Sequence, residues 1–475
     1  MLVLEKCSHL GGTTGIAVGS LTAAGTRFQH AKGITDNPAE HDQDAGKFAA
    51  PEIESCNNES LRKWFLAEAA ETIDWLEGLG LSFYGPSPEP PNRVPRMHNV
   101  VPSARAYIEA LAATSRAAGS NILCQASVVE LLKESDRITG VRAEVQGQTR
   151  DFQASLGVVL AGGDYANSPE LIGRHKGAGY AAIEGINTHS TGEGHYLAES
   201  VGAKLLNMDI TYGPELRFVP PTEKSWTESV PRNQPVRHML AMAANRLPGW
   251  IMRPLIKRLV VTWQHPEDAM FADGAILINA RGERFCNEKS WPDRELAVAQ
   301  QPGKVSYLLL DGRLIERYSA WPHFISTAPD IAYAYVADYL RLRKDVAVKS
   351  DGLEGLARAR AMDPEVLQET TESFNRYLRG ECDDEFGRRG DSHALERGPW
   401  VLLGPAKAYF TTTEGGAAIT EQFQVLDHAG QPIKGLYAVG QNGLGGMILW
   451  GHGLHIAWAM TSGRMVGQVL ADLVE

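Results

Sequence analysis

The sequence predicts an α/β fold in which a buried strand, a group of glycines and a helix occur at both ends of the chain, around an irregular middle. At the C-terminal end, the apolar run Leu436–Val439 precedes six glycines between Gly440 and Gly453, and a helical pattern follows. At the N-terminal end, the strand-like segment Met1–Lys6 precedes Gly11-Gly12-Thr13-Thr14. Residues 169–301 are irregular and rich in proline and tryptophan, as expected of an inserted domain.

Each element is predicted by its periodicity and its turn residues. Apolar residues at helical spacing predict helices at residues 58–81, 103–118, 191–201, 351–358, 363–378 and 454–467. Short apolar runs between turn residues predict strands at residues 1–6, 121–124, 126–132, 138–145, 152–160, 275–278, 283–288 and 436–439. The proline-rich residues 86–95 are predicted to be an extended loop. Glycines follow the strands at 152–160 and 436–439, and there the backbone can approach a ligand closely.

The composition excludes several classes of protein. With 475 residues, the chain is long enough for two or three domains. It carries 46 Lys and Arg against 57 Asp and Glu, a net charge of -11, so neither nucleic acid nor an anionic membrane is predicted as the main partner. The five cysteines are scattered and form no CxxC pair, which indicates reduced thiols, a cytoplasmic protein and no metal site.

Residues Leu247–Trp263 come nearest to a membrane-spanning segment. Pro248, Arg253 and Lys257 interrupt them, and no run in the chain reaches the roughly 18 apolar residues that a span needs. Two interpretations of this segment are open. A basic amphipathic segment would contact a membrane surface, whereas a lid or domain-packing helix would bury its apolar side against the protein.

Short motifs along the chain identify a family. They are Val3–Lys6 with Gly11–Thr14, then Leu160–Gly163, Thr191–Gly194, Gly282–Glu288, Asp384–Arg388 and Gly435–Gly440. In this order, the motifs resemble those of the flavoprotein family of fumarate reductases, succinate dehydrogenase flavoprotein subunits and 3-ketosteroid dehydrogenases. The resemblance covers nearly the whole chain.

The resemblance implies a Rossmann-like FAD-binding domain with an inserted α+β substrate-capping domain, and FAD as the cofactor. The FAD-binding domain would comprise residues 1–170 and 346–475, and the capping domain residues 171–345. In such domains a GxGxxG turn that holds the pyrophosphate lies about 20 residues before an acid such as Glu5. That first βα unit does not precede Glu5 in this sequence. We therefore expect a truncated chain or a misplaced start codon; the alternative is an intact protein with another binding mode. This chain is expected to bind FAD weakly or not at all, with binding restored by residues upstream of Met1.

Carried over by position, the resemblance assigns the cofactor contacts. Glu5 would bind the adenosine ribose, and Val129 would lie near the adenine. The other contacts would come from Lys6, Gly12, Thr13, Thr14, Val18, Gly19, Ala161, Gly162, Gly163, Glu193, Thr413, Gly440, Gln441, His455 and Ile456. Glu193 stands where the family usually has Asp, and Gln441 stands where many members have Glu.

Members of the family move a hydride between flavin N5 and a carbon–carbon bond beside a carbonyl or carboxylate, and exchange a proton at the neighbouring carbon. The dicarboxylate reductases among them bind substrate with arginines and histidines. Here Pro292 stands in place of their proton-donating arginine, with Arg294 close by. Thr412 replaces a histidine, Trp450 stands near a substrate-binding arginine, and His265 corresponds to another substrate histidine. Fumarate and succinate are therefore not the predicted substrates.

The loop Trp450–Gly453 carries the candidate chemistry. The ketosteroid dehydrogenases bind the carbonyl oxygen with a backbone N–H of this loop, and the Gly453 amide matches that donor, although their loop tyrosine has no counterpart. His452 is a candidate acid because imidazole titrates near neutral pH; the alternative is a histidine bonded to the loop backbone. Trp450 is predicted to be an apolar wall, which suits a ring-bearing substrate.

The sequence thus predicts an FAD-dependent oxidoreductase acting on CH–CH groups of an apolar or cyclic small molecule, with an unknown electron donor or acceptor. Arg294 is a second candidate proton donor, and its alternative is a surface ion pair with Asp293 or Glu295. Tyr212 and Tyr409 are further acid/base candidates with structural alternatives. A second hypothesis is an inactive flavoprotein relic that serves as a scaffold or partner subunit.

Overall fold

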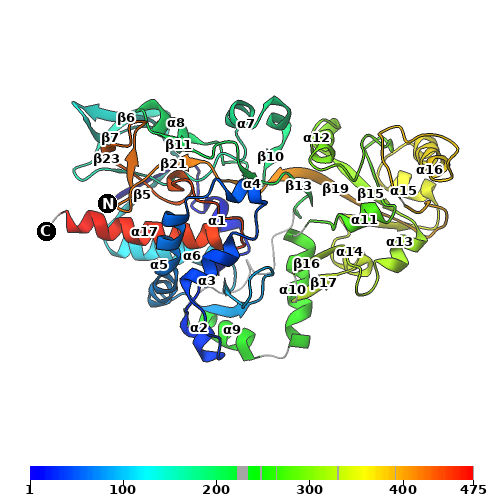
Figure 1. Cartoon of the computed structure of the whole chain (residues 1–475), viewed down its shortest axis with the longest axis horizontal. Coiled ribbons are helices and arrows are strands. Elements are labelled where there is room, and N and C mark those ends of the chain that lie inside the picture. Colours follow the sequence, from blue (N-terminus) through cyan, green and yellow to red (C-terminus); the bar gives the residue numbers. More distant parts are fainter. Residues whose placement is uncertain (222–233, 247–248, 264, 329–330, 391, 474–475) are drawn as a thin grey trace.

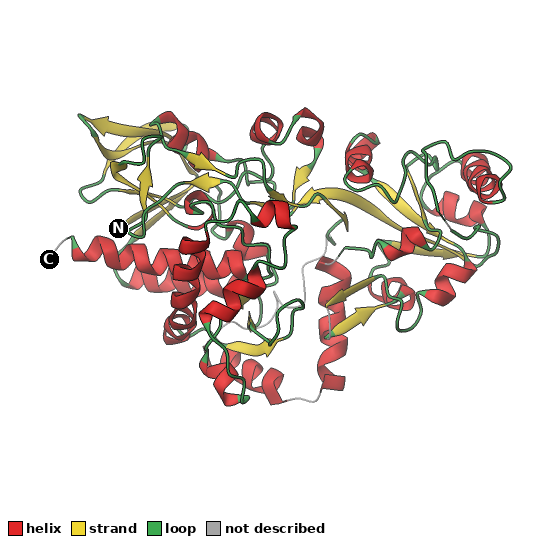
Figure 2. Cartoon of the chain, in the orientation of Figure 1, coloured by secondary structure: helices red, strands yellow, loops and turns green. Residues whose placement is uncertain are grey.

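The computed structural model describes residues 1–221, 234–246, 249–263, 265–328, 331–390 and 392–473. These residues form two lobes that lie side by side (Figure 1). The left lobe holds both ends of the chain, and the right lobe is built from its middle. Helices and strands are mixed in both lobes (Figure 2), which confirms the predicted α/β class.

Strands from both ends of the chain build the left lobe. β1 (Leu2–Glu5) pairs in parallel with β5 (Asn121–Cys124), and β9 (Val158–Leu160) pairs in parallel with β23 (Pro432–Ala438). β7 (Arg137–Val145) pairs with the other end of β23, and among the described residues no pairing joins β1 to β9. The glycine segments follow β1, β9 and β23 at their carboxyl ends, where open parallel sheets bind ligands.

The other elements of this lobe are short, apart from α6 and β6. They are α1 (Gly12–Ile16), β2 (Ser20–Thr22), α2 (Arg27–Ala31), α3 (Pro38–Ala45), α4 (Pro51–Glu54), β3 (Phe83–Ser87), β4 (Met97–Val100), α6 (Arg105–Ala117), β6 (Ala126–Glu134), β8 (Gln148–Gln153), α8 (Glu193–Ser200), β11 (Leu205–Leu206), β12 (Thr211–Tyr212), β20 (Thr412–Thr413), β21 (Gly416–Ala417), β22 (Gln424–Leu426) and the 3-10 turn η4 (Gly440–Gly443).

Two long helices, α5 (Glu59–Gly78) and α17 (Leu454–Asp472), pack against each other in the left lobe. The rings of Phe65 and Trp458 meet edge to face with centroids 5.3 Å apart, and both side chains are fully buried. Arg464 adds ion pairs to α5, with 2.9 Å from Nη2 to Glu68. This packing fixes the start of α17, which follows the glycine-rich segment.

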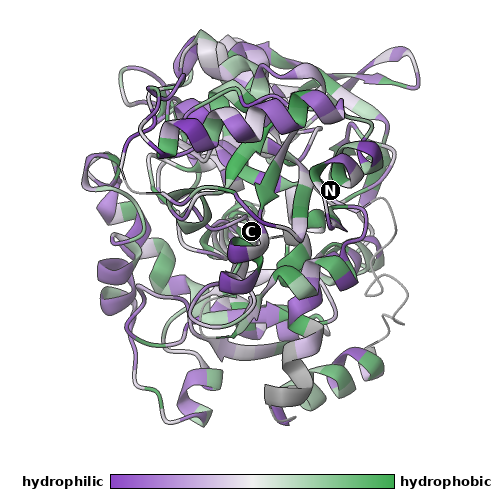
Figure 3. Cartoon of the chain, turned by 90° about the vertical axis from the view of Figure 1, so that its right-hand side faces the viewer, coloured by the Kyte–Doolittle hydropathy of each residue, from purple (hydrophilic) through white to green (hydrophobic). Residues whose placement is uncertain are grey.

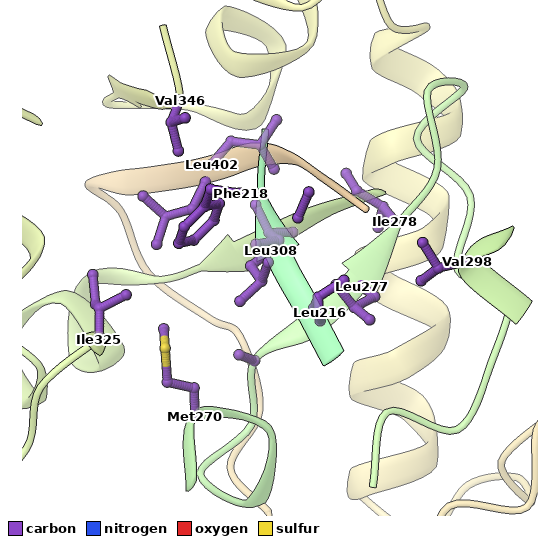
Figure 4. Close-up of a cluster of buried hydrophobic side chains, with 14 of the residues drawn as sticks. Leu216, Phe218, Met270, Leu277, Ile278, Val298, Leu308, Ile325, Val346 and Leu402 are labelled. Atoms are coloured by element: carbon purple, nitrogen blue, oxygen red, sulfur yellow. The ribbon is translucent and has the colours of Figure 1, made fainter. Parts of the chain in front are cut away.

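The right lobe is organised around β19 (Trp400–Phe410). This strand pairs with β15 (Ser306–Leu310), β13 (Glu215–Phe218), β18 (Ala347–Ser350) and β10 (Glu184–Gly185), and β15 continues to β14 (Ile276–Ile278). The inward side chains of these strands, among them Leu216, Leu277, Leu308 and Leu402, form the buried core drawn in Figure 4. Of these strands, the sequence analysis predicted only β14, at residues 275–278.

Helices and short hairpins surround that sheet. They are α7 (Pro169–His175), η1 (Ala178–Ala182), α10 (Gly249–Trp263), α11 (Ala269–Ala272), α12 (Asp293–Ala299), η3 (Pro302–Lys304), α13 (Gly312–Arg317), β16 (Ser326–Ala328), β17 (Ala332–Ala334), α14 (Val336–Leu342), α15 (Leu353–Ala359) and α16 (Pro364–Leu378). α9 (Gln234–Arg246) packs instead on β3 of the left lobe, where Asn245 Nδ2 donates to Phe83 O at 3.1 Å.

The core of the right lobe extends beyond residue 345, where the sequence analysis placed the end of the capping domain. Leu356, Leu367 and Phe374 of α15 and α16 belong to this core, and so does β19 as far as Phe410. The reason is that β19 is the central strand of the sheet. We therefore propose that the chain returns to the FAD-binding lobe after Phe410 and not at residue 346.

Two predicted strands differ in the structure. The predicted strand at 152–160 is interrupted, because β8 ends at Gln153 and β9 begins at Val158. The predicted strand at 283–288 is wrong: only an isolated bridge between Ile278 and Arg284 forms there. The charged residues of that segment instead enter a buried ion-pair network, in which Arg284 and Glu288 meet Asp384 and Arg388.

The segment Leu247–Trp263 is largely α10; Leu247 and Pro248 lie outside the described residues. Val260 and Val261 are buried in the right-lobe core, and Lys257 Nζ lies 2.8 Å from Asp338 Oδ2 of α14. Helices on this side of the molecule mix hydrophilic and hydrophobic residues (Figure 3). No described helix is both long and apolar enough to cross a membrane. These contacts support the domain-packing interpretation of the helix.

We expect Asn58→Ala to lower the free energy of unfolding by about 1 kcal/mol, because Asn58 caps α5. Its Oδ1 accepts from Leu61 N at 3.2 Å, and its Nδ2 donates to Gly445 O of the glycine-rich segment at 2.8 Å. Asn58→Asp is the matched control, since it keeps the cap and removes only the donor. Urea denaturation of both variants measures the difference, and equal losses would show that the cap contributes nothing.

Candidate functional site

The glycine-rich segment between β23 and α17 lies where several predicted motifs meet. Asn442 in η4 accepts a hydrogen bond from Gly162 N at 2.5 Å and donates one to Gly163 O at 3.0 Å. A Cβ on Gly194, at the start of α8, would lie 2.3 Å from Asn442 Oδ1. Only glycine allows α8 to come this close. Asn442 therefore joins three motifs, although the sequence analysis did not select it.

The N-terminal loop reaches the same region through Thr13 and Lys6. Asn187 Nδ2 donates to Thr13 Oγ1 at 3.0 Å, and Thr13 Oγ1 lies 3.2 Å from Ser190 Oγ. Lys6 Nζ lies 2.5 Å from Glu193 Oε1. Burial raises the pKa of Glu193, but hydrogen bonds from Lys6 and a neighbouring threonine outweigh burial and lower it. The two predicted cofactor residues Lys6 and Glu193 thus form a pair.

The other predicted cofactor residues follow the strands and open the helices. Thr14 and Gly12 lie in α1, Ala161 directly follows β9, and His455 and Ile456 lie in the first turn of α17. Glu5 Oε1 accepts from Cys7 N at 2.8 Å. Gly19 packs on α6, since a Cβ there would lie 2.9 Å from Ala104 N. Val129 lies apart from the glycine-rich segment, on β6, and is 48% exposed.

Polar side chains from distant parts of the chain are joined by hydrogen bonds beside Gly440. Gln441 Nε2 donates to Thr412 Oγ1 at 2.8 Å and to Thr413 O at 2.7 Å, and Thr412 Oγ1 donates to Asp164 Oδ2 at 3.2 Å. Burial raises the pKa of Asp164. His455 Nε2 lies 2.9 Å from Oε1 of the fully buried Glu414. The predicted residues Thr412, Thr413, Gln441 and His455 are therefore brought together.

His452 contacts a carboxylate that the sequence analysis did not select. Its Nδ1 lies 2.5 Å from Glu89 Oε1, and its backbone N–H donates to the same oxygen at 2.8 Å. Removal from water lowers the pKa of His452, but the hydrogen bond and the charge of Glu89 outweigh that effect and raise it. Gly453 caps α17 with φ +86°, and a Cβ there would lie 2.8 Å from Ser20 O. Glycine is thus required at this position.

Trp450 packs against an aromatic residue of β12. Its ring meets Tyr212 edge to face, with centroids 5.4 Å apart, and its buried Nε1 has no hydrogen-bond partner in the part of the chain that the structure describes. Burial raises the pKa of Tyr212. Arg217 Nη2 lies 2.6 Å from Glu215 Oε2 on β13. Burial lowers the pKa of His265, and the charge of Glu215 opposes this.

The contacts of Arg294 and Tyr409, two further acid/base candidates, are those of structural residues. Arg294 is buried, with Nη1 2.7 Å from Asp268 Oδ1 and Nη2 2.5 Å from Glu295 Oε1, and its Nη1 also donates to Glu288 O at 3.1 Å. Arg294 thus pairs with Glu295, as in the ion-pair alternative, but the pair is buried and not at the surface, and Asp268 takes the place of Asp293. Tyr409 lies on β19, where burial raises its pKa to about 12.

The residues of the left lobe fit a bound dinucleotide. Nothing lies within 4 Å of a Cβ on Gly12 or Gly163, so backbone is open to a ligand at both loops. Val18, at the end of the N-terminal loop, is 41% exposed. Gln441 Oε1 is buried and has no hydrogen-bond partner among the described residues. Each feature lies where the resemblance puts FAD.

Comparison with known proteins decides the family. Residues 1–223 and 257–450 match the family described as FAD binding domain. The chain belongs to this family. Its cofactor is FAD, and it is an FAD-dependent oxidoreductase of the kind that acts on CH–CH groups.

Its relatives are reductases of several substrates. A probable fumarate reductase of Shewanella frigidimarina is 25% identical over the whole of this chain and 68% of its own length. An NADH:fumarate oxidoreductase of Klebsiella pneumoniae is 25% identical over the whole chain, which spans only 44% of that protein. A vinyl phenol reductase of Lactiplantibacillus plantarum is 24% identical over 99% of this chain and 91% of its own length.

Solved structures share the fold. The open conformation of a flavocytochrome c3 fumarate reductase matches 99% of this chain and 73% of its own, with a TM-score of 0.70 and 22% identity. The 3-ketosteroid delta1-dehydrogenase of Sterolibacterium denitrificans matches 99% of this chain and 95% of its own, with a TM-score of 0.60 and 17% identity. The predicted family and cofactor are confirmed.

Proposed function

We propose that the protein adds or removes a hydride and a proton across a carbon–carbon bond beside a carbonyl, in an apolar, ring-bearing substrate. When bound, FAD exchanges the hydride. The residues of the chain must then hold the ring, polarise the carbonyl and move the proton. One observation carries the proposal: Trp450, His452 and Gly453 lie in a single loop at the start of α17, with Tyr212 against Trp450.

The surroundings of Trp450 support an apolar substrate. The indole packs with Ala49, Ile210 and Ile448, and Tyr212 covers it from the side. Aromatic walls favour flat rings. Among the relatives, the vinyl phenol reductase is named for a substrate that carries an aromatic ring.

The ion pairs of Arg217 and Arg294 argue against a dicarboxylate. Binding two carboxylates in a closed site requires cations that are free to pair with them. Arg217 is paired with Glu215, and Arg294 is paired with Asp268 and Glu295. A dicarboxylate would have to compete with these acids for each guanidinium.

The Gly453 amide supports the polarisation of a carbonyl. Among the described residues it has no acceptor, and it lies at the N-terminus of a 19-residue helix. The helix dipole favours negative charge at that end. A carbonyl oxygen that gains charge during the reaction would be stabilised there.

Oxidation of the reduced flavin by candidate substrates tests the proposal. The protein loaded with FAD is photoreduced without oxygen and mixed with 2-cyclohexenone, a steroid enone or fumarate, with cyclohexanone as the saturated control. We expect an enone to reoxidise the flavin at least about tenfold faster than fumarate, a ratio within the range that pocket contacts provide. Reoxidation by fumarate alone would refute the substrate class, and no reoxidation by any of them would refute the function.

A further inference from the structure

Glu89 lies in the proline-rich loop between β3 and β4, far in sequence from the loop that carries His452. Its Oε1 accepts two hydrogen bonds from the same residue, from His452 N at 2.8 Å and from His452 Nδ1 at 2.5 Å. Glu89 is 6% exposed, whereas the side chain of His452 is 52% exposed. Since Nδ1 is engaged by Glu89, Nε2 is the ring nitrogen left for a substrate.

The loop that carries Glu89 is held by buried ion pairs. Arg96 Nε lies 2.7 Å from Asp36 Oδ2, and Arg96 Nη1 lies 2.7 Å from Asp44 Oδ2; all three side chains are 0% exposed. Arg96 Nη1 also donates to Asn92 Oδ1 at 2.9 Å, and Asn92 Nδ2 donates to Glu89 Oε2 at 3.4 Å. A carboxylate anchored in this way holds its partner in one orientation.

We propose that Glu89 is a positioning residue that holds His452 as the Nδ1–H tautomer, so that Nε2 exchanges the proton with the substrate. This inference rests on the proposed function. The same geometry keeps the imidazolium form paired with a carboxylate, which stabilises the charged acid. Glu89 itself does not contact the substrate in this arrangement.

The proton step balances with the hydride. In reduction, the double bond gains a hydride and its two electrons from the reduced cofactor, which is oxidised. The Nε2–H bond of His452 breaks, a C–H bond forms at the neighbouring carbon, and the ring becomes neutral with Nδ1–H still donating to Glu89. In dehydrogenation the same groups act in reverse, and neutral Nε2 accepts the proton.

Charged groups from the right lobe also face His452. The charges of Glu89 and Glu215 raise the pKa of His452, and the charge of Arg217 lowers it. The charge of His452 in turn lowers the pKa of His265. Burial raises the pKa of Tyr212, and the charges of Glu215 and Glu89 raise it further. Glu89 is the carboxylate in direct contact with His452, so its charge is the one whose removal should alter His452 most.

Histidine-selective 15N and 13C NMR on the FAD-loaded protein tests the pair without turnover. We expect the pKa of His452, assigned with H452Q, to lie above 6.5 and its neutral form to be the Nδ1–H tautomer. In E89Q that pKa should fall by about 1 unit, E89D should keep most of the effect, and E144Q, an exposed control carboxylate, should leave the pKa unchanged. An Nε2–H tautomer, or equal pKa values in wild type and E89Q, would overturn the inference.

The kinetic profile separates this inference from the proposed function. With the enone that reoxidises the flavin fastest, the reoxidation rate falls as pH rises through the pKa of His452. In E89Q this falling limb should move to lower pH by the same amount as the pKa measured by NMR, with an unchanged flavin spectrum. A fall in rate without a shift of the limb would show that Glu89 acts only on stability, which contradicts positioning. If no enone reoxidises the flavin, the proposed function fails, while the NMR measurement still decides the Glu89–His452 pair.

Discussion

Replacement of His452 by glutamine is expected to lower kcat for enone reduction by about 100- to 10,000-fold, the range that a positioned proton donor contributes. Glutamine can keep a hydrogen bond to Glu89, but it cannot carry the proton that the substrate carbon takes up. FAD should remain bound, because Asn442, Gln441 and the segments around them are untouched. Rapid mixing of the reduced protein with substrate measures the step directly.

The control is His428→Gln, since His428 is exposed on the loop before β23 and lies outside the proposed site. That variant should react at the wild-type rate. A rate in H452Q within a factor of about three of the wild type would exclude proton donation by His452, because so small a loss lies far below that of a removed acid. The Gly453 amide would then be the main group that acts on the substrate.

The raised pKa of His452 also fixes the sign of the pH dependence. Reduction needs the protonated ring, so its rate should be highest below this pKa and fall as pH rises through it. Dehydrogenation needs the neutral ring, and its rate should fall as pH is lowered. The contribution of the pair to folding has the same sign as reduction: it is fully present below the unfolded pKa of about 6.5 and is lost as pH rises through the folded one.

Local patterns predicted the elements that depend on local periodicity. The helices at 59–78, 105–117 and 364–378 begin within two residues of their predicted starts, because caps and apolar spacing are contained in the segment itself. The glycine segments were also found, since close backbone approach demands glycine whatever the partner is. The strand predicted at 283–288 does not form, because the charged side chains of this segment form ion pairs with residues about 100 positions away.

The contacts that could not be predicted from the sequence join residues far apart in the chain. Glu89 and His452 are 363 positions apart, and Gly162 and Asn442 are 280 apart, so no spacing rule connects them. Glu89 stands among prolines, which indicate only an extended loop. The boundary that we propose after Phe410 also depends on distant partners, since β19 joins the right-lobe sheet through pairing with strands up to 225 positions earlier.

Glu288→Gln is expected to lower the free energy of unfolding by about 3–5 kcal/mol, as for other variants that leave buried charges without their partner. Glu288 is 0% exposed and receives Arg284 Nε at 2.7 Å, Arg388 Nη1 at 2.9 Å and Leu277 N at 3.2 Å. Without its charge, Arg284 keeps Asp384 as an ion-pair partner, whereas the Arg388 guanidinium keeps no carboxylate among the described residues. Urea denaturation at a fixed FAD concentration measures the loss, because bound cofactor adds to stability.

The matched control is Glu283→Gln, a few residues away in the same segment. Its pair with Arg281 is exposed on both sides, and exposed pairs contribute only about 0–1 kcal/mol. Two of the motifs that identify the family, Gly282–Glu288 and Asp384–Arg388, meet at Glu288, so the network accounts physically for their joint presence. Equal losses in the two variants would contradict this account, because they would mean that the network adds no more stability than a surface ion pair.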